Sequence, residues 1–209
     1  PRPRARDGFG AAARVRRGSA GPSMKVVLGL GNPGPEYADT RHNVGWWLLD
    51  HLASRWKAKR FERGRSLESA SARVGGEEVR LVKPLTYMNR SGLVARALAG
   101  EVDVGRDLLV LVDDAALPPS SARMRAQGSA GGHNGLLSIE GALGTAAYPR
   151  LRIGVGGPPP GVELAEWVLS PFDAAEDEER VLAILPRLAD GVEVWVREGV
   201  ERAMNVTNR

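Results

Sequence analysis

The stretch VVLGLGNPGPEYADTRHNVGWW, from Val26 to Trp47, decides the fold. The short apolar, β-branched run at 24–30 ends in glycine, which predicts a buried strand. Residues 43–57 place their apolar side chains at helical spacing, which predicts a helix. A strand, a glycine turn and a helix in this order are typical of an open α/β sheet.

The turn Gly29-Leu30-Gly31-Asn32-Pro33-Gly34 has the G-x-G-x-x-G spelling of a dinucleotide-binding motif. That motif needs a helix at its third glycine and an acid at the end of the next strand. Residues 35–42 lack helical apolar spacing, and Asp50, the acid at a suitable distance, lies inside the helix pattern. We therefore expect no dinucleotide site. The turn instead places Asn32 at a strand end, where sites gather, although a left-handed turn position is the simpler explanation for an Asn.

Strands alternate with helices along the rest of the chain. We expect strands at 70–74, 78–83, 108–112, 121–126 and 151–155, and helices at 89–99, 131–143 and 174–199. The first two strands flank a glycine pair, which is a hairpin signal, and Pro186 should kink or interrupt the last helix. A hairpin within this alternation predicts a single three-layer α/β domain, with a mixed, twisted β-sheet flanked by helices.

The composition fits one globular domain over residues 24–209, because 43% of the 209 residues are apolar. Absence of cysteine excludes disulfides and thiolate metal sites, and it suits a reducing compartment. No apolar run approaches the roughly 20 residues of a membrane helix, so we expect a soluble protein.

The net charge of +4 comes from the first 23 residues, which hold six arginines and one acid. Residues 24–209 carry 23 basic and 24 acidic side chains, so an RNA-binding surface there requires local clustering. We expect residues 1–23 to be a disordered basic extension, since they have little to bury. They could precede a true start at Met24, target the protein, or contact RNA nonspecifically.

Polar residues stand at the ends of the expected elements. Asp113 ends a strand, and His42 and His133 each precede a helix. A His paired with a strand-end Asp is a general base whose tautomer is fixed by its partner. With no cysteine and no GxSxG elbow, a His-activated water is the simplest hydrolytic scheme. A metal bound by these three residues is conceivable, but no two histidines have the short spacing of typical ligands.

Three asparagines could supply neutral hydrogen bonds to a substrate carbonyl or to a developing oxyanion. Asn32 follows the first strand, whereas Asn89 and Asn134 each open a helix. Helix capping is the alternative explanation for the last two. The residues by themselves thus predict only a hydrolase-like site.

Taken together, five stretches resemble the bacterial-type peptidyl-tRNA hydrolases: GLGNPGPEYADTRHNVG (29–45), VKPLTYMNRSG (82–92), LLVLVDDAALPP (108–119), GSAGGHNGLLSI (128–139) and YPRLRIGVG (148–156). They span nearly all of residues 24–209. This family cleaves the ester between a peptidyl or N-blocked aminoacyl group and the 3′-terminal ribose of tRNA, which recycles tRNA from aborted translation. The resemblance implies a monomeric, cytoplasmic enzyme without cofactor or metal, acting on the 3′ CCA end and acceptor region of peptidyl-tRNA.

The resemblance also implies roles for single residues. His42 would activate water, Asp113 would orient His42, and Asn32 would distinguish N-blocked from free aminoacyl groups. Residues at the family's other substrate-binding positions are Tyr37, Tyr87, Asn89 and Asn134. The segment 156–168 matches a mobile, lid-like segment near the family's site.

Basic residues that could contact tRNA phosphates alternate on two expected strands. We expect Arg123, Arg125 and Arg152 to contact the RNA. Arg150 alternates with Arg152 on the same expected strand, and a further basic run spans 57–65. A solvated surface is the alternative for each group. The chain departs from the family pattern at Ala115-Ala116, where an acid is common, and its stretch 127–130 is less glycine-rich.

A non-catalytic RNA-binding relative of the same fold is the alternative function. In such a relative we would expect another residue in place of the base or of its orienting acid. Both His42 and Asp113 are present, which favours the enzyme.

Overall fold

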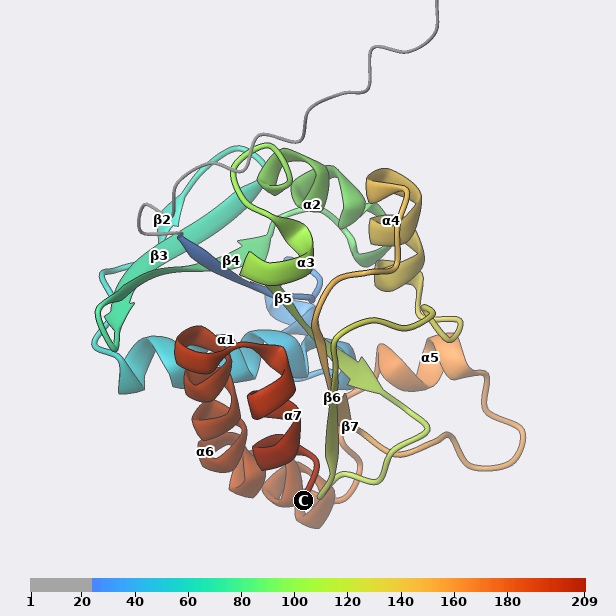
Figure 1. Ribbon diagram of the computed structural model, residues 1–209. Helices are drawn as coiled ribbons and strands as arrows, with labels where there is room; N and C mark the ends of the chain where they lie inside the picture. Colours follow the sequence, from blue (N-terminus) through green and yellow to red (C-terminus); the bar gives the residue numbers. More distant parts are fainter. Residues whose placement is uncertain (1–23) are drawn as a thin grey trace, which may run out of the picture.

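The computed structural model describes residues 24–209, so the expectations for residues 1–23 lie outside the described part of the chain. One sheet of seven strands runs through its centre in the order β2-β3-β4-β1-β5-β7-β6 (Figure 1). The strands are β1 Lys25–Gly29, β2 Glu62–Arg63, β3 Leu67–Val74, β4 Glu77–Pro84, β5 Leu108–Asp114, β6 Ala122–Arg125 and β7 Arg150–Gly154. The four central strands are parallel and both edges are antiparallel, which confirms the predicted mixed sheet.

Helices cover both faces of the sheet, which confirms the three layers (Figure 1). One face carries α1, α6 and α7, and the other carries α2 and α4. The helices are α1 Val44–Arg55, α2 Gly92–Leu98, α3 Val104–Asp107, α4 Asn134–Leu143, α5 Leu164–Val168, α6 Ala175–Glu198 and α7 Val200–Thr207. No helix among the described residues combines the length and apolarity that crossing a bilayer requires.

The central strands are buried on both faces, and this explains their continuous apolar runs. In β1, Val27 faces the core under α1 and α6, whereas Val26 and Leu28 face the core under α2 and α4. In β5, Leu109 likewise faces the core under α1 and α6, and Val110 faces the core under α2 and α4. Successive side chains of a strand point to opposite faces, so one apolar strand serves two cores.

The glycines of the first turn serve the packing of α1. A Cβ atom added to Gly29 would lie 2.7 Å from the carbonyl oxygen of Gly45, and one added to Gly31 would lie 2.7 Å from the indole of Trp46. Both separations are too short, so the helix fits only against bare backbone. Asp50 lies in α1, as expected, and binds Lys83. The glycines that match the dinucleotide-binding motif are thus explained by the packing of α1 against this turn.

Two local features differ from the sequence expectations. Pro186 does not interrupt α6, which runs from Ala175 to Glu198. A proline removes the hydrogen bond to the carbonyl four residues earlier, and that residue, Leu182, is exposed enough for water to replace it. The short elements β2, α3, α5 and α7 were not predicted, and α7 begins directly after Gly199, where we expected the helical sequence to end. The hairpin is confirmed, with Gly75 and Gly76 at φ 61° and 94°, as in a type I′ turn.

Candidate active site

The predicted catalytic residues meet at the carboxyl edge of the sheet, where the central parallel strands end. β1 and β5 are parallel neighbours, so Asn32, just after β1, and Asp113, at the end of β5, lie at the same edge. His42 reaches this edge from the 3₁₀ turn Arg41–Asn43, which precedes α1. His133 arrives there from the residue before α4.

His42 and Asp113 form a buried pair. The Nδ1 atom of His42 lies 2.8 Å from Oδ1 of Asp113, and the two residues are 7% and 2% exposed. An ionised carboxylate only accepts hydrogen bonds, so Nδ1 carries the proton. The lone pair of neutral His42 is therefore on Nε2, and this atom is available as a base.

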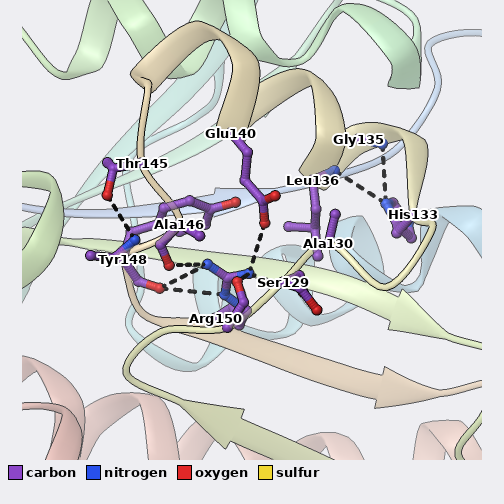
Figure 2. Close-up of polar contacts among 12 residues, drawn as sticks. Ser129, Ala130, His133, Gly135, Leu136, Glu140, Thr145, Ala146, Tyr148 and Arg150 are labelled. Carbon is purple, nitrogen blue, oxygen red and sulfur yellow. Dashed lines mark hydrogen bonds and ion pairs between the residues drawn. The ribbon is translucent and has the colours of Figure 1, made fainter.

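His133 binds the same carboxylate oxygen, a contact that the sequence reasoning missed. Its Nε2 lies 2.9 Å from Oδ1 of Asp113. Its Nδ1 accepts the backbone N–H of Gly135 at 3.1 Å and of Leu136 at 3.4 Å (Figure 2). The helix N–H groups thus fix the tautomer with a proton on Nε2, which donates to Asp113. A His in the capping position before a helix was the available sequence signal.

Asp113 is held as a carboxylate by its surroundings. Burial by itself would raise its pKa, but the electrostatic attraction and the hydrogen bonds of the His133 and His42 N–H groups outweigh burial. The pKa of Asp113 therefore lies well below its ordinary value of 3.8. The carboxylate accepts from both rings throughout the neutral pH range.

Within residues 24–209, His42, Asp113 and His133 form a group that could bind a metal ion, since their ligand atoms lie within 4.8 Å of one another. Tetrahedral zinc with bonds of about 2.0–2.1 Å separates its ligand atoms by about 3.3 Å. The His–Asp separations of 2.8 and 2.9 Å are shorter and fit N–H···O hydrogen bonds. The arrangement thus fits shared protons better than a bound metal.

Asn32 has one end of its side chain fixed by the backbone. Its Oδ1 accepts the N–H of Met88 at 2.8 Å, so the other end is Nδ2, a donor. Asn43 holds the Asn32 backbone through two hydrogen bonds of 2.9 and 3.0 Å. Among the described non-glycine residues only Lys57 has a positive φ, so the left-handed explanation for Asn32 is wrong.

The capping explanation is also wrong for the other two asparagines. His133, not Asn134, caps α4 with its side chain. Asn89 lies in the 3₁₀ turn Met88–Arg90, and α2 begins only after Ser91. Neither amide is used to start a helix, and both line a pocket beside His42.

Two pockets flank His42. The amide pocket, of about 440 Å³, is lined by Asn32, Tyr37, His42, Tyr87, Met88, Asn89, Arg90, Asn134, Ala165, Val168 and Leu169. The glycine pocket, of about 340 Å³, is lined by His42, Asp113, Asp114, Ala115, Ala116, Gly131, Gly132, His133, Asn134, Arg152, Leu164, Ala165 and Val168. His42, Asn134 and two side chains of α5 line both, so α5 forms a shared wall.

The tyrosines pack together at the mouth of the amide pocket. The rings of Tyr37 and Tyr87 meet edge to face with centroids 6.4 Å apart. Tyr87 is 55% exposed, which is unusual for a large aromatic side chain and suits contact with a ligand. The structure thus brings both predicted tyrosines to the site.

The predicted arginines have different surroundings. Arg123 and Arg125 are exposed on one face of the edge strand β6. Arg152 lines the glycine pocket and binds Asp114 at 3.3 Å and the carbonyl of Ser129 at 2.8 Å. The basic run at 57–65 includes Lys57 and Lys59. These two lie near Met24, at the amino end of β1, whereas the site lies at the carboxyl end.

Arg150 is buried and therefore does not contact phosphates, contrary to the expectation from the sequence. It is 1% exposed and forms an ion pair with Glu140 at 3.3 Å (Figure 2). Its guanidinium also donates to the carbonyls of Gly128, Ala146 and Tyr148. Arg150 therefore fastens the loops around α4 to the sheet.

A buried His–Asp pair beside a pocket lined with amides, at the carboxyl edge of an α/β sheet, has the features of a water-activating hydrolase site. The family model described as Peptidyl-tRNA hydrolase matches residues 26–209. The chain therefore belongs to the peptidyl-tRNA hydrolase family.

Individual relatives agree with this assignment. The chain is 50% identical over 187 residues to the peptidyl-tRNA hydrolase of Symbiobacterium thermophilum, covering 88% of this chain and 98% of the relative. It is 44% identical to that of Gemmatimonas aurantiaca, covering 89% and 100%. The crystal structure of peptidyl-tRNA hydrolase from Acinetobacter baumannii superposes with a TM-score of 0.82 at 31% identity, covering 91% and 97%.

Proposed function

We propose that this protein hydrolyses the ester between a peptide, or an N-blocked aminoacyl group, and the 3′-terminal ribose of tRNA. One observation carries the proposal. The buried pair of His42 and Asp113, joined at 2.8 Å through Nδ1, leaves Nε2 of His42 without a bond to Asp113, in a residue that lines two pockets. The reaction needs no cofactor, since water supplies the nucleophile.

In the proposed reaction Nε2 of His42 removes a proton from water as its oxygen attacks the ester carbonyl. Asp113 stabilises the imidazolium that forms, because its carboxylate already holds Nδ1–H. The side-chain amides of the amide pocket stabilise the oxyanion. The bond between the carbonyl carbon and the ribose oxygen then breaks as the imidazolium returns its proton to that oxygen. The products are a free 3′-terminal hydroxyl and a peptide carboxylic acid, which releases its proton to solvent and becomes a carboxylate.

Asn32 explains selectivity for blocked substrates. With Oδ1 occupied by the Met88 N–H, it offers only donors to the amide pocket. The carbonyl oxygen of a blocked amino group can accept such a bond, whereas the ammonium of a free aminoacyl-tRNA cannot. A site that hydrogen-bonds one substrate group discriminates strongly against a substrate lacking it.

The two pockets suggest which way the substrate lies. The amide pocket, with its amides and tyrosines, suits the peptide. The glycine pocket contains Arg152, whose cross-strand neighbour is Arg123 on the exposed strand β6. The terminal nucleotide would therefore occupy the glycine pocket, and the acceptor region of tRNA would reach Arg123 and Arg125. We further propose that the enzyme acts as a cytoplasmic monomer with residues 24–209 as its catalytic domain.

The test compares hydrolysis of N-acetyl-aminoacyl-tRNA with that of the unblocked aminoacyl-tRNA, by wild type and His42→Ala. We expect cleavage of the blocked form alone, with turnover reduced by about 10²–10⁴-fold in the variant. Affinity for tRNA should change little, because the ring acts on the reacting water and not on a phosphate. Binding of tRNA by the wild type without any cleavage would instead indicate the non-catalytic alternative.

A further inference from the structure

Arg41, the residue before His42, is a buried cation that the proposed reaction does not use. It is only 2% exposed. Burial of a guanidinium is costly unless its charge and N–H groups are satisfied. Its partners therefore indicate what it does.

Its partners all belong to the segment 167–173, which includes the C-terminal end of α5 and the turn that follows. The guanidinium donates to Oγ of Ser170 at 2.7 Å, to the carbonyl of Ser170 at 3.2 Å, to that of Trp167 at 3.4 Å, and to that of Pro171. Its remaining amino group binds the exposed carboxylate of Asp173 at 3.1 Å. A planar fork of several donors suits such a set of acceptors better than a lysine would.

Aromatic rings and backbone complete the contact. The guanidinium lies 3.4 Å from the ring centroid of Trp167 and 4.9 Å from that of Phe172. The backbone N–H of Arg41 donates to the carbonyl of Ser170 at 3.2 Å, and Thr40 forms a β-bridge with Pro171. Residue 41 is thus bound to this segment through side chain and backbone alike.

The segment bound by Arg41 carries one wall of the site. Ala165 and Val168 of α5 line both pockets beside His42. The indole of Trp167 ties the helix at a second point, through a 2.8 Å hydrogen bond to the carbonyl of Gly156. The five-residue helix is too short to be stable alone, so these two ties determine its position.

We propose that Arg41 is a positioning residue that fixes α5 as the common wall of the amide and glycine pockets. The inference rests on the proposed hydrolase function. Arg41 holds the ester between the pockets by holding α5, and it takes no part in the proton transfers at His42. Its loss should therefore raise KM and leave kcat nearly unchanged.

The experiment measures steady-state hydrolysis of N-acetyl-aminoacyl-tRNA and amide hydrogen exchange of residues 164–170 in wild type, Arg41→Met and Arg41→Lys. We expect Arg41→Met to raise KM about 10-fold, to change kcat less than about 3-fold, and to speed exchange in α5 at least 10-fold. Arg41→Lys should recover part of each effect, because it keeps the charge but not the fork. Arg55→Met is the matched control, since Arg55 binds Asp190 and Glu193 on α6, and it should change neither quantity.

A double variant, Ser170→Ala with Asp173→Asn, covers the case in which Arg41→Met fails to fold. It weakens the same contact from the other side, and we expect KM to rise about 3-fold with kcat unchanged. Folded variants with unchanged KM and unchanged exchange would overturn the inference, and so would a loss confined to kcat. If the wild type does not hydrolyse the substrate, the proposed function fails, and hydrogen exchange alone still decides whether Arg41 fixes α5.

Discussion

At the residue scale, the orientation of the Asn32 amide is fixed by a single backbone hydrogen bond. Asn32 presents Nδ2 to the amide pocket because the N–H of Met88 occupies Oδ1. The selectivity that we propose for blocked substrates would therefore depend on the backbone N–H of Met88. The tautomer of His133 is likewise fixed by backbone N–H groups, those at the start of α4.

We predict that Asn32→Asp reduces selectivity for blocked substrates. The new carboxylate still accepts the Met88 N–H, but it presents an acceptor, not a donor, to the substrate. kcat/KM for N-acetyl-aminoacyl-tRNA should fall about 30- to 100-fold, and the ratio of blocked to free substrate should fall with it. Asn32→Ala is the control, since it removes the donor without adding charge. An unchanged ratio in Asn32→Asp would refute this role.

Single residues also mark how far the sequence could be interpreted. Asn89 and Asn134 look like helix caps in sequence, and only the structure reveals that His133 caps α4 and that α2 begins after Ser91. Arg150 and Arg152 alternate on one strand and look equivalent, yet Arg150 is buried at 1% exposure. Spacing predicts which face a side chain takes, whereas burial depends on loops that are distant in sequence.

At the element scale, β6 is the strand that could contact the tRNA. It is an edge strand, and Arg123 and Arg125 are exposed on it, two residues apart. An exposed arginine that neutralises a phosphate contributes to the salt dependence of binding. The position of β6 beside Arg152 links this surface to the glycine pocket.

We predict that the double variant Arg123→Ala with Arg125→Ala weakens the binding of full-length N-acetyl-aminoacyl-tRNA far more than the binding of a short CCA-ended substrate. The dependence of log KM on log salt should become shallower by roughly 0.7–0.9 for each phosphate that the variant no longer neutralises. The matched control is Arg63→Ala with Arg65→Ala, a pair of the same spacing near β2, at the other edge of the sheet. Equal losses on both substrates would place the tRNA elsewhere.

Elements with strong periodicity were predictable, and short ones were not. The central strands and α1 follow from apolar runs because burial there is complete on the faces that they present. The helix α5 has only five residues, and its place depends on Arg41, more than 120 positions away in sequence. Such a contact leaves no local pattern, so only the broad segment 156–168 could be assigned to the site.

At the scale of the whole molecule, the fold brings distant residues to the carboxyl edge of one sheet. The chain crosses from β1 to α1, returns through a hairpin to β4, and then reaches β5 on the other side of β1. This order places Asn32 and Asp113 at the same edge although they are far apart in the chain. The two hydrophobic cores, one under α1 and one under α4, pack against opposite faces of the sheet.

Tyr148 gives a test of stability for the whole domain. Its hydroxyl is buried without a hydrogen-bond partner among the described residues, and burial raises its pKa from 10.0 to about 12. The unfolded chain loses this proton at lower pH than the folded one. Stability should therefore fall as pH rises from about 10 to about 12, by up to about 1.4 kcal/mol per pH unit from this group.

We predict that Tyr148→Phe removes this contribution. At pH 7 its free energy of unfolding should lie within about 1 kcal/mol of wild type, since the lost hydroxyl makes no bond. At pH 11 the variant should gain stability relative to wild type, as measured by urea unfolding at both pH values. Other groups that titrate there cancel in the difference. A constant difference between the two proteins would contradict the buried, unpaired hydroxyl.

Single-turnover hydrolysis of N-acetyl-aminoacyl-tRNA by wild type and Asp113→Asn tests whether His42 acts as a base through its buried partner. The asparagine keeps the shape of the carboxylate but cannot hold His42 in the same tautomer or stabilise its imidazolium. We expect rapid cleavage by wild type and a rate about 10²–10⁴-fold slower in the variant, with tRNA affinity unchanged. Near-normal cleavage by Asp113→Asn would contradict this expectation, because the base would then work without its buried partner.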